Sequence, residues 1–223
     1  MRSKAVVIIS FATSALAGTP VSIKPHPFFS SWGVLGCKIN INRVAYWPFQ
    51  PDCNKPCIKL TASNGNSLHV LHIDKSGGSY DISYDAWNYL STGVSATVNP
   101  TYGGAIQAEY ESVSMDNCKD IIKTSDGSLP VMAGNPDPYT LCPPGTWSHD
   151  HVSFWNFGSQ DCSMGVDEQC TMPPGVGSQA QCPTFGGASK VNCAMRIKNL
   201  LTPGAVDVAP AGCPAVAPRT FTA

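Results

Sequence analysis

The sequence predicts a mainly β protein that is rich in loops and held together by disulfide bonds. Three observations support this fold class. The chain of 223 residues contains 20 glycines and 19 prolines, and both residue types are costly in helix interiors, which disfavours helix bundles and coiled coils. It contains ten cysteines, an even number. Several short segments alternate apolar and polar residues, as half-buried strands do.

The first 17 residues have the parts of a secretory signal peptide. Arg2 and Lys4 precede a short apolar run, and Ala15-Leu16-Ala17 fits the A-x-A cleavage pattern. The run is shorter than the ~20 apolar residues that cross a bilayer, and no later stretch reaches that length. We therefore expect a secreted, extracellular protein without a membrane partner. The alternative for this segment is a buried N-terminal helix.

The cysteines agree with an extracellular location, because disulfides persist in oxidising compartments. Ten cysteines predict up to five bridges, but sequence spacing does not settle how they pair. Four lie before residue 120 and six after residue 140, so each part could close its own bridges. The absence of any Cys-x2-Cys pair disfavours zinc. The ten positions are Cys37, Cys53, Cys57, Cys118, Cys142, Cys162, Cys170, Cys182, Cys193 and Cys213.

Residues 18–31 are polar and proline-rich, and we expect them to form an extended N-terminal arm. Residues 32–122 are strand-like. Within them, segments 58–62 and 68–73 alternate apolar and polar residues on either side of an Asn64-Gly65 turn, which is a strong β-hairpin signal.

The next segments predict one helix and a closing strand. Residues 82–90 read as a short helix, with Ser83 or Asp85 as its N-cap and Gly93 as its stop. Residues 105–113 alternate again and end the segment. Residues 123–223 form a Cys-, Gly- and Pro-rich extension in which only 152–157 and 193–200 look regular. Because such a segment buries little apolar area alone, we expect disulfides to staple it to the preceding domain.

The stretch from Cys53 to Cys118 resembles the double-psi β-barrel of expansins, barwin-like proteins and family-45 endoglucanases. The resemblance implies a six-stranded barrel with a short helix. The matching segments are CNKPCIKL (53–60), HVLHID (69–74), GGSYDIS (77–83), AWNYL (86–90) and the closing stretch 104–113.

With GCKIN (36–40) and RVAYWP (43–48) added, the pattern is similar to a group of small secreted proteins of filamentous fungi. Members associated with plant infection are treated as virulence effectors, and at least one is thought to inhibit papain-like cysteine proteases. The resemblance implies a secreted fungal effector-like protein that binds an extracellular host protein. The most specific form of this hypothesis is inhibition of a papain-like cysteine protease.

Some relatives with this barrel are hydrolases, and the sequence shows whether their catalytic carboxylates are present here. An inverting glycosidase needs two carboxyl groups on either side of a water molecule. Asp81 stands where the family has its catalytic acid, but Pro48 stands where the partner carboxylate is expected. The sequence therefore predicts a protein that is not an enzyme, with Asp81 as a residual catalytic candidate.

A second hypothesis follows from the same resemblance: polysaccharide binding or wall loosening without hydrolysis, as in expansins. It implies an open groove formed by one carboxylate and several aromatic residues. The candidate groove residues are Tyr46, Asp74, Tyr80, Asp81 and Trp87.

For protein binding, the aromatic-rich segment 147–157 is the preferred surface, because Trp and Tyr are favoured anchors at interfaces. Its alternative role is to form the small core of the extension. The Gly77-Gly78 loop is the second candidate. His149 and His151 would point to one face of a strand, but a third metal ligand is missing, so we expect no metal. The candidate contact residues of the segment are Trp147, His149, Asp150, His151 and Trp155.

The remaining observations exclude other function classes. A formal net charge of −1 offers no basic surface for nucleic acid. The sequence has neither a Gly-x-Ser-x-Gly elbow nor a phosphate-binding glycine loop, and we expect no cofactor.

Overall fold

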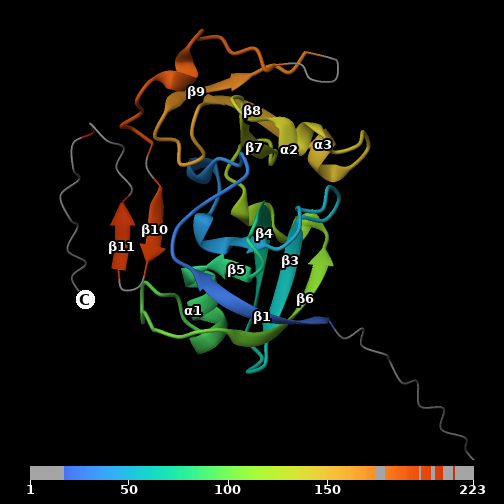
Figure 1. Cartoon of the computed structure of the whole chain (residues 1–223), viewed down its shortest axis with the longest axis vertical. Coiled ribbons are helices and arrows are strands. Elements are labelled where there is room, and N and C mark those ends of the chain that lie inside the picture. Colours follow the sequence, from blue (N-terminus) through green and yellow to red (C-terminus); the bar gives the residue numbers. More distant parts are fainter. Residues whose placement is uncertain (1–17, 174–178, 196, 202–203, 208–212, 214–223) are drawn as a thin grey trace, which may run out of the picture.

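The computed structural model describes residues 18–173, 179–195, 197–201, 204–207 and 213. The predicted signal peptide at 1–17 lies outside these residues. Within them, no helix is both long enough and apolar enough to cross a bilayer. The chain forms a closed barrel, with a smaller three-stranded sheet lying over it (Figure 1).

Six strands close the barrel in the order β1-β5-β2-β4-β3-β6. Strand β1 runs parallel to β5 and strand β2 runs parallel to β4, while the other neighbours are antiparallel. This is the six-stranded double-psi β-barrel that the sequence predicts. The strands are β1 (Thr19–His26), β2 (Val44–Trp47), β3 (Cys57–Ala62), β4 (Ser67–Lys75), β5 (Tyr80–Ser83) and β6 (Ile106–Val113).

The expected N-terminal arm at 18–31 is in part a barrel strand, which corrects the prediction. Strand β1 lies between β5 and β6 and closes the barrel. Val21 and Ile23 are buried at alternate positions, and the residues between them face outward. The strand was not predicted because its apolar–polar alternation rests on only two apolar residues in a proline-rich stretch. Both of its partner strands also lie more than 50 residues away in the sequence.

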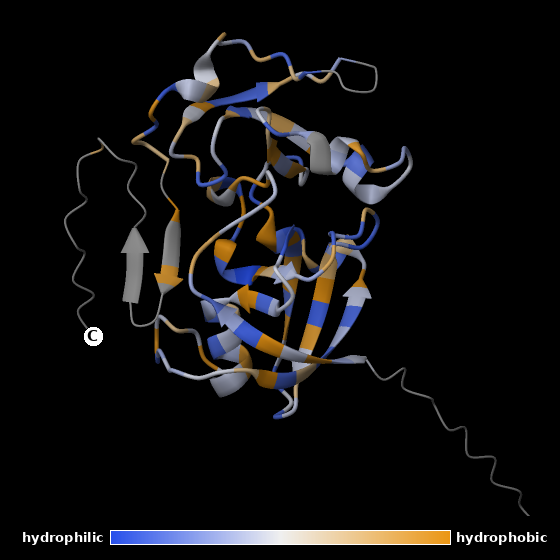
Figure 2. Cartoon of the chain, in the orientation of Figure 1, coloured by the Kyte–Doolittle hydropathy of each residue, from blue (hydrophilic) through white to orange (hydrophobic). Residues whose placement is uncertain are grey.

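The predicted hairpin and helix are confirmed. Strands β3 and β4 pair around a turn in which Gly65 has φ +89°. Helix α1 (Tyr84–Thr92) follows Ser83 and ends at Gly93, whose φ of +82° suits a residue without a side chain. Figure 2 shows apolar and polar residues in alternating bands along the barrel strands.

The extension forms a second layer of structure. Its three-stranded sheet has the order β7-β8-β9, and a two-stranded sheet pairs β10 with β11. The elements are β7 (Leu129–Met132), α2 (Asp137–Thr140), α3 (Trp147–Asp150), β8 (Val152–Phe157), β9 (Gly165–Cys170), β10 (Lys198–Leu201) and β11 (Gly204–Asp207). Short 3-10 helices are η1 (Gly36–Lys38), η2 (Ile41–Arg43), η3 (Met115–Asn117), η4 (Lys119–Ile121) and η5 (Gly187–Ser189).

Two apolar clusters hold these layers. One fills the barrel and includes Trp47 and Leu60, with Leu90 of helix α1 packed against them. The other lies between the barrel and the extension, where Tyr46 meets Phe154 of strand β8 in the same buried cluster. The extension therefore shares a core with the barrel.

All ten cysteines are paired, as the sequence predicts. The expectation that each part could close its own bridges is wrong for two of them, because Cys37–Cys162 and Cys53–Cys142 join the N-terminal half of the chain to the extension. These bridges staple the extension to the barrel. The other three are Cys57–Cys118, Cys170–Cys182 and Cys193–Cys213.

Candidate functional site

A small surface pocket lies where strand β1 ends against helix α1. Its volume is about 120 Å³. The lining is dominated by aromatic rings and prolines, and among these Tyr102 is 72% exposed. The lining residues are Pro25, His26, Pro27, Tyr84, Trp87, Tyr102 and Gly103.

Helix α1 places two of the rings. Tyr84 and Trp87 lie three residues apart on the helix and stack with their centroids 6.0 Å apart. The Tyr84 hydroxyl donates to the carbonyl of Thr101 at 2.7 Å, and the Trp87 indole donates to the carbonyl of Gly104 at 3.0 Å. Both rings are therefore fixed to the loop that follows the helix.

Gly103 is required for this close approach. A Cβ atom on Gly103 would lie 2.6 Å from the Trp87 ring, which is closer than real Cβ atoms come. A side chain at this position would therefore push the loop away from the ring.

Asp81 lies on strand β5 beside the pocket, opposite Lys24 of β1. Its carboxylate is part-buried, and burial raises its pKa, while the neighbouring His26 and Lys24 side chains act in the opposite direction. His26 thus borders both the pocket and Asp81. No side-chain hydrogen bond to another described residue engages this carboxylate, so it is available to a ligand hydroxyl.

The predicted groove of Tyr46, Asp74, Tyr80, Asp81 and Trp87 does not form one open surface. Tyr46 is 2% exposed and lies under the His26 ring at a centroid distance of 4.3 Å, and burial raises its pKa. Asp74 is engaged by a hydrogen bond from the Ser30 hydroxyl at 2.9 Å. The extension covers this side of the barrel, which the barrel sequence alone did not reveal.

Tyr80 and Trp87 do not line an open groove either. The Tyr80 ring packs in a group of aromatic rings. Its centroid lies 5.3 Å from that of Trp47 and 6.1 Å from that of Phe49. Adjacent strand residues point to opposite faces, so Tyr80 faces away from the side that Asp81 occupies. Trp87 is buried and contributes only to the pocket wall.

The carboxylates do not form a glycosidase pair around a cleft. Tyr46 pairs with Asp81 on one side and with Asp74 on the other, so the two acidic residues are two strand spacings apart, roughly 10 Å between backbones. The buried Tyr46 ring lies in the row between them. Asp52, the other nearby carboxylate, accepts the backbone N–H groups of Asn54 and Lys55 and therefore shapes a turn.

The segment 147–157 has two separate parts. Residues Trp147–Asp150 form a helical turn, α3, so His149 and His151 do not share the face of a strand as predicted. His151 stacks on the Trp147 ring at 5.1 Å and 3°, and His149 contacts Asp150 at 2.7 Å. His151 and Asp150 are exposed.

The second part of the segment is strand β8. Phe154 and Phe157 are buried, so this strand contributes to the core of the extension. The Lys38 ammonium lies 3.6 Å from the centroid of the Trp155 ring and also binds Asp167 at 2.6 Å. Trp155 is therefore held by a structural contact, and the exposed part of the segment is the α3 turn.

Two further predictions concern the Gly77-Gly78 loop and metals. The loop is exposed, and Gly78 has φ +131°. Nothing lies within 4 Å of the position that a Cβ atom would take on either glycine. Among the described residues, no three His, Cys, Asp or Glu side chains gather in a way that could hold a metal ion.

Of the pocket residues, the sequence analysis named only Trp87 as a binding candidate, because the others come from separate segments. Pro25, His26 and Pro27 were placed in an arm, Tyr84 at the start of the predicted helix, and Tyr102 in an unassigned loop. The parallel pairing of β1 with β5 brings the arm to the helix. The only local signal was the run of prolines and aromatics at 25–29.

No curated protein matches the sequence. One solved structure that is similar to part of the chain is described as the solution structure of the fungal elicitor cerato-platanin. It has 22% sequence identity, a TM-score of 0.33, and covers 44% of this chain and 96% of the other.

The sequence model of the cerato-platanin family matches residues 30–121, which is less than half of the chain. Proteins of this family are non-catalytic and are secreted by fungi. The non-catalytic character of that family agrees with the sequence prediction, in which Pro48 stands where a second carboxylate is expected. Residues 30–121 of this chain are similar to the cerato-platanin family, and the extension lies beyond that similarity.

Proposed function

We propose that this is a secreted, non-enzymatic protein that binds cell-wall polysaccharide through the pocket beside Asp81. The observation that supports the proposal most is a set of aromatic and proline surfaces next to one carboxylate that has no catalytic partner. Sugar rings present apolar faces that pack on such surfaces, and their hydroxyls donate to carboxylates. Sites of this kind combine an apolar lining with a few polar groups that fix orientation.

The match to the cerato-platanin family supports the same substrate class, since proteins of that family bind extracellular components such as cell-wall polysaccharides. The matching residues 30–121 include Tyr84, Trp87, Tyr102 and Asp81. They exclude Pro25, His26 and Pro27, which strand β1 adds to the pocket.

Retention on insoluble chitin and cellulose tests this proposal. The wild type should be retained, and Tyr102→Ala and Asp81→Asn should each be retained less. Phe185→Ala is the matched control, because Phe185 is a fully exposed aromatic residue on the extension. Neither the wild type nor Asp81→Asn should release reducing sugar. The proposal fails if the wild type is not retained, or if Tyr102→Ala and Phe185→Ala behave alike.

A second candidate function is inhibition of a papain-like cysteine protease by the α3 turn. The observation that favours it is that this exposed turn is rigidly attached. The Ser148 amide donates to the Cys53 carbonyl at 2.7 Å, the Trp147 amide donates to the Asn54 side chain at 3.3 Å, and Cys53 is bridged to Cys142. A rigid loop loses little entropy when it docks.

The wild type should inhibit papain if this second function is correct. Inhibition should be weaker in Trp147→Ala and unchanged in Trp155→Ala. Substitution of Gly77-Gly78 tests the other loop. Papain that is unaffected at high micromolar concentrations of wild type would exclude the idea.

A further inference from the structure

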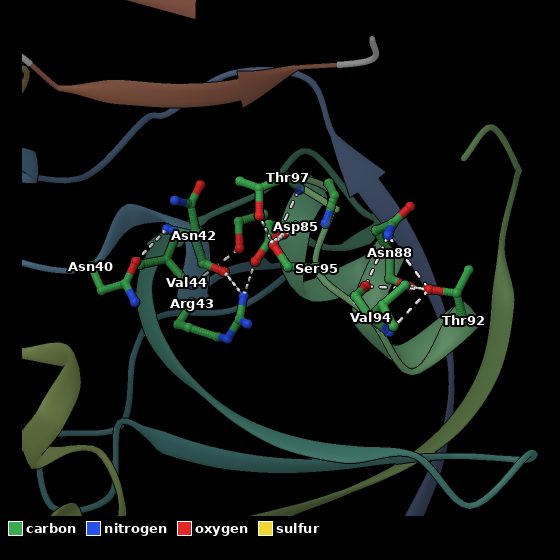
Figure 3. A network of polar contacts seen from close by, with 12 residues as sticks. Asn40, Asn42, Arg43, Val44, Asp85, Asn88, Thr92, Val94, Ser95 and Thr97 are labelled. Atoms are coloured by element: carbon green, nitrogen blue, oxygen red, sulfur yellow. Dashed lines mark hydrogen bonds and ion pairs between the residues drawn. The ribbon is translucent and has the colours of Figure 1, made fainter. Parts of the chain in front are cut away.

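The loop at 93–104, which connects helix α1 to strand β6, carries Tyr102 and Gly103 of the pocket. It contains no helix or strand. Its large apolar side chains point outward, since Val98 is 76% exposed and Tyr102 is 72% exposed, while the small Ala96 is buried in the cluster that fills the barrel. The loop therefore lacks an apolar core of its own, and polar groups of helix α1 fasten it instead (Figure 3).

We propose that Asp85 and Asn88 are positioning residues that hold this loop so that Tyr102 and Gly103 keep the shape of the binding pocket. This inference rests on the proposed polysaccharide binding. Asp85 and Asn88 lie three residues apart on helix α1 and so share one face of it. Both are buried, Asp85 at 4% and Asn88 at 0% exposed.

Asp85 holds the first part of the loop. Its Oδ1 atom accepts hydrogen bonds from the Ala96 amide at 2.7 Å and from the Ser95 hydroxyl at 2.6 Å. Its Oδ2 atom accepts from Arg43 at 2.5 Å. The Arg43 contact fixes the carboxylate, so Asp85 presents a fixed acceptor to the loop.

Asn88 holds the middle and the end of the loop. Its Oδ1 atom accepts from the amide of Thr101 at 2.9 Å and from the hydroxyl of Thr101 at 2.7 Å. Its Nδ2 atom donates to the carbonyls of Val94 and Asn99, each at 3.0 Å. Both polar atoms of the side chain are thus used by the loop.

This arrangement bears directly on the pocket because Thr101 precedes Tyr102. A fully satisfied buried polar network restricts the groups that it holds to one arrangement. Holding a binding surface in its bound shape reduces the entropy lost on association. Release of Thr101 should therefore weaken binding even though Asn88 lines no part of the pocket.

Asn88→Ala tests the inference by two measurements. Hydrogen exchange of the Thr101 amide should become faster while the amides of β3 and β4 keep their protection. Binding to soluble oligomers of the retained polysaccharide should weaken about ten-fold. This corresponds to ~1.4 kcal/mol of extra free energy that is needed to order the loop when the ligand binds. Thr101→Val is a milder variant that keeps the fold, removes only the hydroxyl contact, and should show a smaller change in the same direction.

Asn156→Ala is the matched control. Asn156 is 3% exposed, and its Nδ2 atom donates to Glu168 at 2.6 Å and to the Thr184 carbonyl at 2.9 Å, so it fastens a different loop. This variant should lose stability but keep binding. Equal loss of binding in both variants would attribute the effect to general destabilisation and overturn the inference.

The two proposals fail in different ways. A wild type that binds no polysaccharide refutes the proposed function. Faster exchange of Thr101 in Asn88→Ala with unchanged binding refutes the positioning role and leaves the proposed function intact.

Discussion

Arg43 of helix η2 donates a hydrogen bond to the Asp85 carboxylate of helix α1 at 2.5 Å. The contact is also an ion pair in which the Asp85 side chain is 5% exposed and the Arg43 side chain is 24% exposed. It links the start of strand β2 to the helix that closes one end of the barrel. Because a buried carboxylate is costly without its partner, this pair makes the helix and the strand depend on each other.

Removing the cation should therefore be costly. Arg43→Ala should lower the free energy of unfolding by roughly 3 kcal/mol, because it leaves Asp85 buried without a countercharge. Urea denaturation followed by tryptophan fluorescence measures this loss. Lys59→Ala, on the outer face of β3, serves as the control and should change the midpoint little. Equal midpoints for Arg43→Ala and the wild type would contradict the prediction.

Gly103 and Gly104 of the pocket loop should differ in how an alanine substitution affects polysaccharide binding. Gly103→Ala should weaken polysaccharide binding strongly, because its Cβ atom would meet the Trp87 ring at 2.6 Å. Gly104→Ala should leave binding near the wild-type value, because nothing lies within 4 Å of a Cβ atom there. Titration with soluble oligosaccharides compares the two variants. A similar affinity for both would show that the loop does not shape the site.

His72 should make stability depend on pH. Burial lowers its pKa to about 4, while backbone hydrogen bonds from its ring and the charge of Asp52 act against that shift. The unfolded chain takes up a proton at about pH 6.5, which the folded chain resists, so stability falls as the pH decreases from about 6.5 to about 4. The full loss is up to about 3 kcal/mol.

Urea unfolding between pH 7 and pH 4 tests this dependence. His72→Phe should flatten the curve relative to the wild type. Parallel curves for the wild type and His72→Phe would show that other groups account for the acid sensitivity.

The bridges that cross between the two layers should contribute more than a local one. Replacing Cys37 and Cys162 by serine opens a loop with a sequence separation of 125, against 12 for Cys170 and Cys182. Chain entropy predicts a loss of about 4–5 kcal/mol for the first and about 3 kcal/mol for the second. Thermal unfolding of the two double-serine variants compares them, and the reverse order of stability would disagree with this account.

The local elements were predictable because their signals are local. The hairpin of β3 and β4 is specified by an Asn-Gly turn and by alternation on each side of it. Helix α1 begins directly after Ser83, a predicted N-cap position whose side chain makes no capping hydrogen bond, and ends at Gly93. Each signal lies within a few residues of the structure that it determines.

The site was less predictable because its parts meet through long-range pairing. Strand β1 has little pattern of its own, and its place beside β5 decides where His26 lies. Tyr46 looked like a groove residue because the sequence does not show that the extension packs over that side of the barrel. Asp81 and Trp87 were identified from the barrel motifs, but Tyr84, Tyr102 and the residues of strand β1 beside them were not.

The two bridges that cross the layers also determine what happens when the backbone is cut. A single cleavage between residues 143 and 161 would separate the chain into two pieces, yet Cys53–Cys142 and Cys37–Cys162 anchor the ends of both pieces to one barrel. The nicked molecule would keep its full mass until a reductant is added. A cut in the α3 turn would thus leave both pieces joined covalently.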